Sequence, residues 1–310
     1  GNVFSATEPA TSALLSIGVT AGLQWNQIPS PITLQHATLE GATGTNLALL
    51  GGELNLKDST LTTVDGRLIL GGLATTGTVQ LDEVKSVNFP DEVRRSDVIL
   101  ADASLISVET GSVDIFSNAL RLSGESRLAT ATNSLSDTGS ITLNVEDSIE
   151  LTESTIESLT AGPGKAGHIV IKTGQLRLIG SDIETRTSAT GNAGDVYIQA
   201  QESIELDTNF ETGNITSILS AINTGASGTG GEIEIETSAL HVLNGSRILA
   251  SASGTSESGN ITITASESVD LRGIFESLSG VNFSSISTTS SSNSTVASGN
   301  VTITTGQLRI

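Results

Sequence analysis

The sequence predicts an all-β fold, a parallel β-helix with about three short strands in each coil of about 28 residues. Three observations lead to it. Apolar and polar residues alternate from Ile141 to Val145 and again from Ile149 to Leu151, which is the period of strands with one buried face. A Gly-rich turn follows, and the same pattern begins again at Gly167. No window shows the 3.6-residue period of an amphipathic helix.

The order of the elements is set by glycines that open the first strand of each coil. They are Gly111, Gly139, Gly167, Gly194, Gly231, Gly259 and Gly299, at spacings of 28, 28, 27, 37, 28 and 40 residues. The two long spacings hold one coil plus about ten extra residues, around 207–214 and 272–283. Insertions at one corner of a solenoid form surface loops, so Phe210, Phe275 and Phe283 are candidate binding residues. The alternative is that these rings pack on the body of the solenoid.

Stacked coils predict rows of equivalent side chains. The inward rows of the first strand are Val113, Ile141, Ile169, Val196, Ile233, Ile261, Val301 and Ile115, Leu143, Ile171, Ile198, Ile235, Ile263, Ile303. The second strand contributes Leu120, Ile149, Leu176, Ile204, Leu240, Val269 and Leu308. Its outward row is Arg121, Glu150, Arg177, Glu205, His241, Asp270 and Arg309. Charges that alternate from coil to coil penalise a slipped pairing, so this row is interpreted as a register device rather than a charged binding stripe.

Three regions are expected along the chain. Residues 1–30 do not fit the repeat and resemble no coil, residues 31–110 form irregular coils, and residues 111–310 form regular coils continuous with them. A less regular stretch lies at 83–96. Both ends look interrupted, so the chain is expected to be a fragment.

Composition excludes several classes of function. The chain has 310 residues, no Cys and no Met, and a net charge of −20 from 14 Lys and Arg against 34 Asp and Glu. This charge disfavours nucleic acids and anionic membranes as partners. Without Cys there are neither disulfides nor thiolate metal sites. No apolar run is long enough for a transmembrane helix, and no cofactor is predicted.

One polar row could carry chemistry. His168, Asp195 and Glu232 are expected on adjacent coils, near enough for acid–base work or a metal ion, although polar residues are also expected beside a Gly turn. A carbohydrate-cleaving β-helix would draw on Asp195, Glu232 and Glu234, with Lys172 at a distance. Because no calcium-binding loop, nucleophile elbow or phosphate loop is present, neither a metal site nor an enzyme is predicted.

Several segments carry a family resemblance. They are Gly-Asn-Ile-Thr-Ile-Thr-Ala at 259–265, Gly-Asn-Val-Thr-Ile-Thr-Thr at 299–305, Arg67-Leu-Ile-Leu-Gly-Gly-Leu, and the opening Phe4-Ser-Ala-Thr-Glu-Pro followed by Gly22-Leu-Gln-Trp. Together they resemble cyanobacterial exoproteins of the filamentous-haemagglutinin type, at the point where the secretion domain passes into the repeats. The resemblance implies that residues 1–30 are the end of a secretion-domain-like region. The family's Asn-rich secretion motifs would lie upstream.

The resemblance implies a secreted or surface-displayed, adhesin-like stalk without enzymatic activity, folded as a right-handed β-helix. It also implies export by two-partner secretion through an outer-membrane transporter, and a surface glycan or a protein as the ligand. Two alternatives stay open. One is a carbohydrate-active β-helix enzyme, either a polysaccharide lyase or a hydrolase, and the other is a passive stalk for a C-terminal effector.

Overall fold

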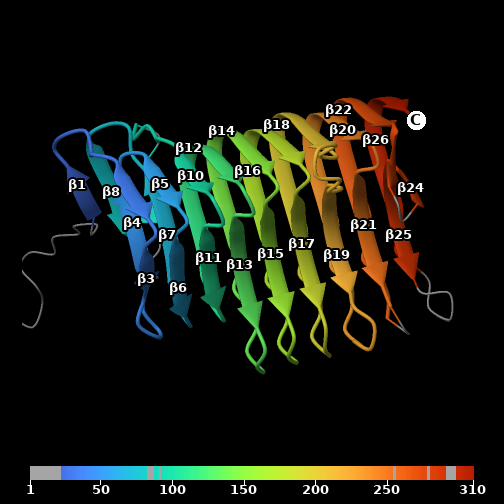
Figure 1. Ribbon diagram of the computed structural model, residues 1–310, viewed down its shortest axis with the longest axis horizontal. Coiled ribbons are helices and arrows are strands. Elements are labelled where there is room, and N and C mark those ends of the chain that lie inside the picture. Colours follow the sequence, from blue (N-terminus) through green and yellow to red (C-terminus); the bar gives the residue numbers. More distant parts are fainter. Residues whose placement is uncertain (1–21, 82–86, 91, 254–255, 278–279, 291–297) are drawn as a thin grey trace, which may run out of the picture.

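The computed structural model describes residues 22–81, 87–90, 92–253, 256–277, 280–290 and 298–310. Among these residues every regular element is a β-strand, so the all-β prediction is confirmed. The strands form an elongated stack that runs from β1 at one end to β25 and β26 at the other (Figure 1). Most of the predicted N-terminal region 1–30, up to residue 21, lies outside the described residues.

Two parallel sheets run along the stack, and successive coils add strands to both. Sheet I is formed in order by β2 (Ile32–Gln35), β5 (Leu54–Lys57), β10 (Val98–Ala101), β12 (Ser112–Ser123), β14 (Ile141–Thr152), β16 (Ile169–Ile179), β18 (Val196–Asp207), β20 (Ile233–Leu243), β22 (Ile261–Arg272) and β26 (Val301–Arg309), with β4 (Leu47–Gly51) and β7 (Arg67–Gly72) joined to β12 beside that path. Sheet II is formed by β3 (Thr38–Glu40), β6 (Thr60–Val64), β11 (Leu105–Glu109), β13 (Arg127–Thr132), β15 (Thr155–Thr160), β17 (Asp182–Thr187), β19 (Ser217–Ile222), β21 (Arg247–Ala252) and β25 (Ser285–Ser290). This arrangement is compatible with a β-helix or solenoid.

The division of a coil into strands changes along the stack. The coil of β4, β5 and β6 consists of separate strands. In β12 the first half pairs with β7 and the second half with β10, so this one strand replaces two earlier ones. The register of its pairing with β14 shifts between Ser117 and Ala119, where the strand is irregular. The later strands of sheet I have the same form, because their pairings shift at the equivalent place.

The pairing register confirms the predicted inward rows. Val113 lies opposite Ile141, Ile141 opposite Ile169, and the row continues in the predicted order to Val301. From β12 to β22 the three rows are at most 2% exposed, and they belong to one core cluster. Each such aliphatic side chain contributes about 1.5–3 kcal/mol by its burial. The layered aliphatic rows are therefore the main source of stability along the stack.

The strand-opening glycines permit a close approach of successive coils. A Cβ atom at Gly194 would collide with the backbone carbonyl oxygen of Gly167, at a separation well under 3.0 Å. The same relation links Gly231 to Gly194, and the row continues to Gly299. An inward-pointing side chain of sheet II forms a hydrogen bond with this glycine row: Thr185 Oγ1 donates to the Gly194 carbonyl oxygen at 2.6 Å. Glycine is required at these positions because the neighbouring backbones leave no space for a side chain.

Segments with antiparallel strands leave the regular path near both ends of the stack. Residues between β7 and β10 contribute β8 (Gly77–Leu81) and β9 (Val87–Asn88), which form an antiparallel sheet with β1 (Gly22–Trp25). Arg95 docks this insertion on sheet I, because its guanidinium lies 5.4 Å from the Phe89 ring and donates to the Asn144 carbonyl oxygen at 2.8 Å. Near the other end, β23 (Ile274–Ser277) and β24 (Gly280–Phe283) pair as an antiparallel hairpin between β22 and β25.

Candidate functional site

The predicted polar cluster lies at the corner where the long strands of sheet I begin. His168 Nδ1 is 3.0 Å from Asp195 Oδ2, and it also accepts a hydrogen bond of 3.0 Å from the Asp195 amide. The Glu232 amide donates to Asp195 Oδ1 at 2.7 Å. The carboxylate of Glu232 instead accepts from Asn260 Nδ2 at 3.3 Å. The three residues therefore lie on adjacent coils as predicted, but only His168 and Asp195 bring their side chains together.

This corner works as a brace between coils. The side chain of His168 binds the amide of Asp195, and the side chain of Asp195 binds the amide of Glu232. Asn260 continues the relation, since its Oδ1 accepts from the Asn300 amide at 2.8 Å. Backbone amides at a strand start need acceptors, and these side chains supply them. The geometry accounts for polar residues here without chemistry.

Tyr197 belongs to the same cluster and was missed from the sequence. Its hydroxyl donates to Asp195 Oδ2 at 3.0 Å, and its ring centroid is 6.0 Å from that of His168. Burial, and then the hydrogen bond to Asp195, raise the pKa of Tyr197 to about 12. The phenol is therefore protonated at neutral pH and is not a base there. Tyr197 could have been identified from the sequence, because a residue two positions after Asp195 lies on the same face of the strand.

Lys172 lies near one of the three candidate carboxylates, Glu234, which corrects the prediction that it is distant from all of them. It lines a hollow of about 200 Å³ together with Tyr197 and Glu234. The cause is the register, which places Lys172 opposite Gln199 and Gln199 opposite Glu236. Within the part of the chain that the structure describes, no group of three His, Asp or Glu side chains is arranged to hold a metal ion.

The alternating charged row of sheet I is confirmed by the register from Arg121 to Arg309. Arg121 Nε lies 3.6 Å from Glu150 Oε2, and Arg177 Nε lies 3.0 Å from Glu205 Oε1. One member differs from the expectation of an outward, solvated charge. Asp270 is only 3% exposed.

The burial of Asp270 follows from the two arginines and the histidine that converge on it. Its Oδ2 is 3.1 Å from Arg272 Nη2, 3.6 Å from His241 Nδ1 and 3.9 Å from Arg309 Nη1. A carboxylate on a short side chain is readily enclosed by three longer cationic or aromatic ones. The charged row therefore consists of local ion pairs that differ in their exposure to solvent. This agrees with a role in fixing the pairing register of the strands.

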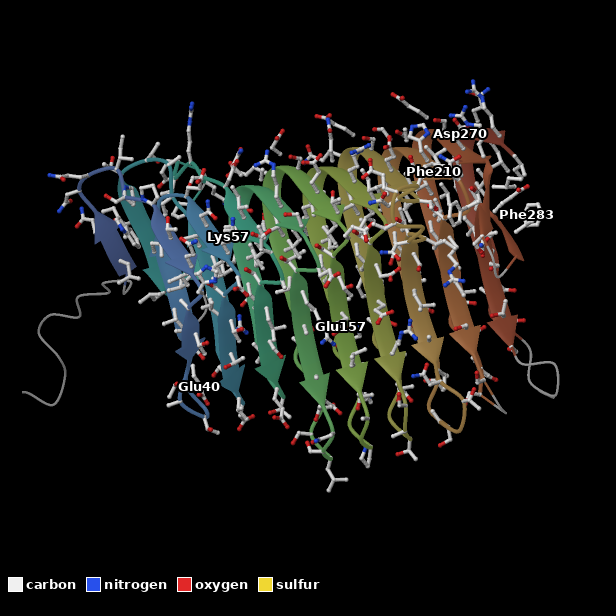
Figure 2. All side chains as sticks on the ribbon, in the orientation of Figure 1. Glu40, Lys57, Glu157, Phe210, Asp270 and Phe283 are labelled. Atoms are coloured by element: carbon white, nitrogen blue, oxygen red, sulfur yellow. The ribbon has the colours of Figure 1, made fainter. Side chains whose placement is uncertain are left out.

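The candidate phenylalanines lie on the two predicted insertions near the C-terminal end (Figure 2). The ring centroids of Phe210 and Phe275 are 5.9 Å apart in an edge-to-face arrangement, so the two insertions contact each other. Phe275 is half-buried and lies against Gly245. Phe210 is 61% exposed and Phe283 is 67% exposed. The alternative of packing on the body therefore describes Phe275 and not the other two, whose role in binding stays a prediction.

A groove on the outer face of sheet II was not anticipated from the sequence. It has a volume of about 580 Å³ and crosses β11, β13, β15 and β17, which stand side by side in Figure 1. One row of paired residues lines it, namely Glu109, Ala131, Leu159 and Arg186. The first residues of the turns that follow these strands form its other wall. It is larger than the hollow beside Lys172.

No family model, curated protein or solved structure matches this chain. Among the described residues there is no helix long and apolar enough to cross a membrane.

Proposed function

We propose that this chain is a rigid stalk segment of a secreted or surface-displayed, adhesin-like exoprotein of the filamentous-haemagglutinin type, without enzymatic activity of its own. The observation that carries the proposal is the single apolar core that continues from coil to coil, from Leu54 to Val269, with Ile32 and Ile303 packed against its ends. A solenoid whose coils contact only their neighbours grows in length without a change in its cross-section. Such a body provides reach and a long lateral surface.

The finer features of the proposal come from the motif resemblance. The stack is a right-handed β-helix in which each long strand of sheet I takes the place of two of the three strands of a coil. The chain is exported through an outer-membrane transporter of the two-partner type and folds outside the cell. The lack of Cys suits a chain that crosses a membrane unfolded. The ligand of the complete exoprotein is a surface glycan or a protein.

Two measurements test the stalk. Small-angle scattering of the purified chain should give a particle elongated along the stack rather than a sphere, in which the nine steps from β2 to β26 extend over roughly 43 Å at about 4.8 Å each. In the source cells, an antibody raised against this chain should label intact cells or the culture medium. Deletion of the partner transporter should abolish that labelling. Labelling confined to the cell interior would contradict export, and surface labelling unaffected by the deletion would contradict the two-partner route.

The cluster of His168, Asp195 and Tyr197 favours one second candidate, a carbohydrate-active β-helix enzyme. The test is incubation of the purified chain with acidic polysaccharides, followed by measurement of new reducing ends. The stalk proposal expects no cleavage. Cleavage that disappears in Asp195→Ala, and persists in a variant changed at the far end of the stack such as Leu23→Ala on β1, would establish the enzyme instead.

A further inference from the structure

We propose that the groove on the outer face of sheet II binds a neutral, hydroxyl-rich oligosaccharide that lies along the stack, across β11, β13, β15 and β17. The inference deepens the proposed function, since it names a ligand class for the lateral surface of the stalk. It is carried by the shape of the groove, by the chemistry of its lining and by its charge.

The shape fits an extended ligand. Glu109 pairs with Ala131, Ala131 with Leu159, and Leu159 with Arg186, so this row runs across the strands. At about 4.8 Å per strand, Glu109 and Arg186 are three steps, or roughly 14 Å, apart. The volume of about 580 Å³ lies within the usual range for small-ligand sites of roughly 300–1,000 Å³. The hollow exists because Ala131 and Ala161 are small and stand among longer side chains.

The lining combines an apolar floor with polar groups at its edges. Ala131, Leu159 and Ala161 offer apolar surface to the carbon–hydrogen faces of sugar rings. The side chains of Glu109 and Asn133 have no hydrogen-bond partner among the described residues, so their oxygen and nitrogen atoms are available to hydroxyl groups. A carboxylate or an amide presents two polar atoms in a plane and can bind neighbouring hydroxyls together.

The far end of the groove is already ordered. Arg186 Nε donates to Glu184 Oε2 at 2.8 Å, and Glu184 is only 9% exposed. Asn223 Nδ2 donates to Ser188 Oγ at 2.8 Å on the wall formed by the turns. Polar groups that are held in place before binding lose little conformational entropy on contact with a ligand. This end should therefore fix the orientation of the oligosaccharide.

The charge and the backbone disfavour other ligands. Arg186 is compensated by Glu184, and Glu109 adds a second carboxylate, so the groove repels polyanions, as does the net charge of −20. An extended peptide would gain affinity by adding a strand at a sheet edge. The strands under this groove are internal and pair on both sides, so no such edge is offered. The groove therefore suits a neutral ligand that binds through its hydroxyl groups.

The experiment is isothermal titration of the purified chain with cellohexaose, mannohexaose, maltohexaose and chitohexaose. At least one should bind. Leu159→Arg, which fills the floor of the groove, should weaken that binding at least about tenfold, and Glu109→Gln should weaken it severalfold. Ser251→Arg is the matched control, because Ser251 occupies the same row on β21 outside the groove. It should leave affinity unchanged.

A second measurement locates the ligand and guards against misfolding. Methyl resonances of Leu159 and Ala131 should shift on titration with the bound sugar, whereas those of Leu23, on β1 at the end of the stack, should not. If circular dichroism shows that Leu159→Arg has lost structure, Asn133→Ala replaces it, since that side chain is exposed. Failure of all four sugars to bind, or undiminished binding in the folded groove variants, would overturn the inference. None of these results would affect the proposed elongated shape or the proposed export, which are tested separately.

Discussion

Gly194→Ala should lower the free energy of unfolding by about 3 kcal/mol, although it adds a single methyl group. Gly194 lies over Gly167 of the preceding coil, and the added carbon would overlap a backbone carbonyl oxygen. A backbone atom cannot rotate out of the way as the end of a side chain can. The strain is relieved only if β16 and β18 separate locally.

The magnitude follows from three contributions. Overpacking at a rigid contact costs about 3 kcal/mol, at the upper end of the usual range. Separation of the coils weakens the hydrogen bond from Thr185 Oγ1 to the Gly194 carbonyl oxygen, which is worth about 1 kcal/mol. Alanine also restricts the unfolded chain, which returns about 1 kcal/mol of stability. The net loss is therefore about 3 kcal/mol.

The assay is urea denaturation combined with amide hydrogen exchange, because a stack of coils need not unfold in one step. Protection should fall most in β16, β18 and β20. Gly225→Ala is the control: Gly225 has a φ of 89° and no atom within 4 Å of the added carbon, so only conformational strain of about 1–2 kcal/mol applies. Equal losses in the two variants, or protection lost evenly along the chain, would refute the close-approach argument.

Three further predictions concern the core, the charged row and the corner cluster. Leu143→Ala should cost about 2–5 kcal/mol in urea denaturation, and Leu135→Ala, at an 84% exposed site, less than about 0.5 kcal/mol; similar values would argue against the inward row. Glu150→Arg, which opposes like charges on both sides, should cost about 0.5–1 kcal/mol more than Glu150→Gln at low salt, and this difference should vanish near 1 M salt. Ultraviolet titration of Tyr197, the only tyrosine, should give a pKa of about 12 that falls toward 10 in Asp195→Asn. Since the folded-state value is the higher one, the contribution of this phenol to stability is complete below about pH 10 and is lost as the pH rises to about 12.

Local alternation was enough to predict the rows of the stack. Ile141, Ile169 and Val196 share a position in a repeated pattern, and parallel pairing brings such positions together whatever the details of the turns. The opposite charges of Arg121 and Glu150 could be paired in the same way. These features depend only on the period within a strand and the spacing between coils.

Features that depend on distances between residues of different coils could not be predicted from the sequence. The glycine row was visible in the sequence, but its cause is a distance between backbones of different coils. The joining of two strands in β12 was hidden because Ser117 and Asn118 carry no strong turn signal. Likewise, the groove combines Glu109, Leu159 and Arg186, none of which stands out within its own strand. The predicted distance between Lys172 and Glu234 was wrong for the same reason, since Lys172 was judged by its position in the sequence rather than by its register.

The order of pairing also determines how the molecule would respond to a pulling force. Hydrogen bonds that run along the long axis of the stack join each coil of sheet I to the next, so tension applied at the ends acts on one interface after another. Release of a 28-residue coil would free about 95 Å of chain in place of a rise of about 4.8 Å. In single-molecule force spectroscopy the steps should follow the glycine spacings, with longer steps for the coils of 37 and 40 residues. The stack would thus extend stepwise under load, dissipating energy and keeping its remaining coils folded.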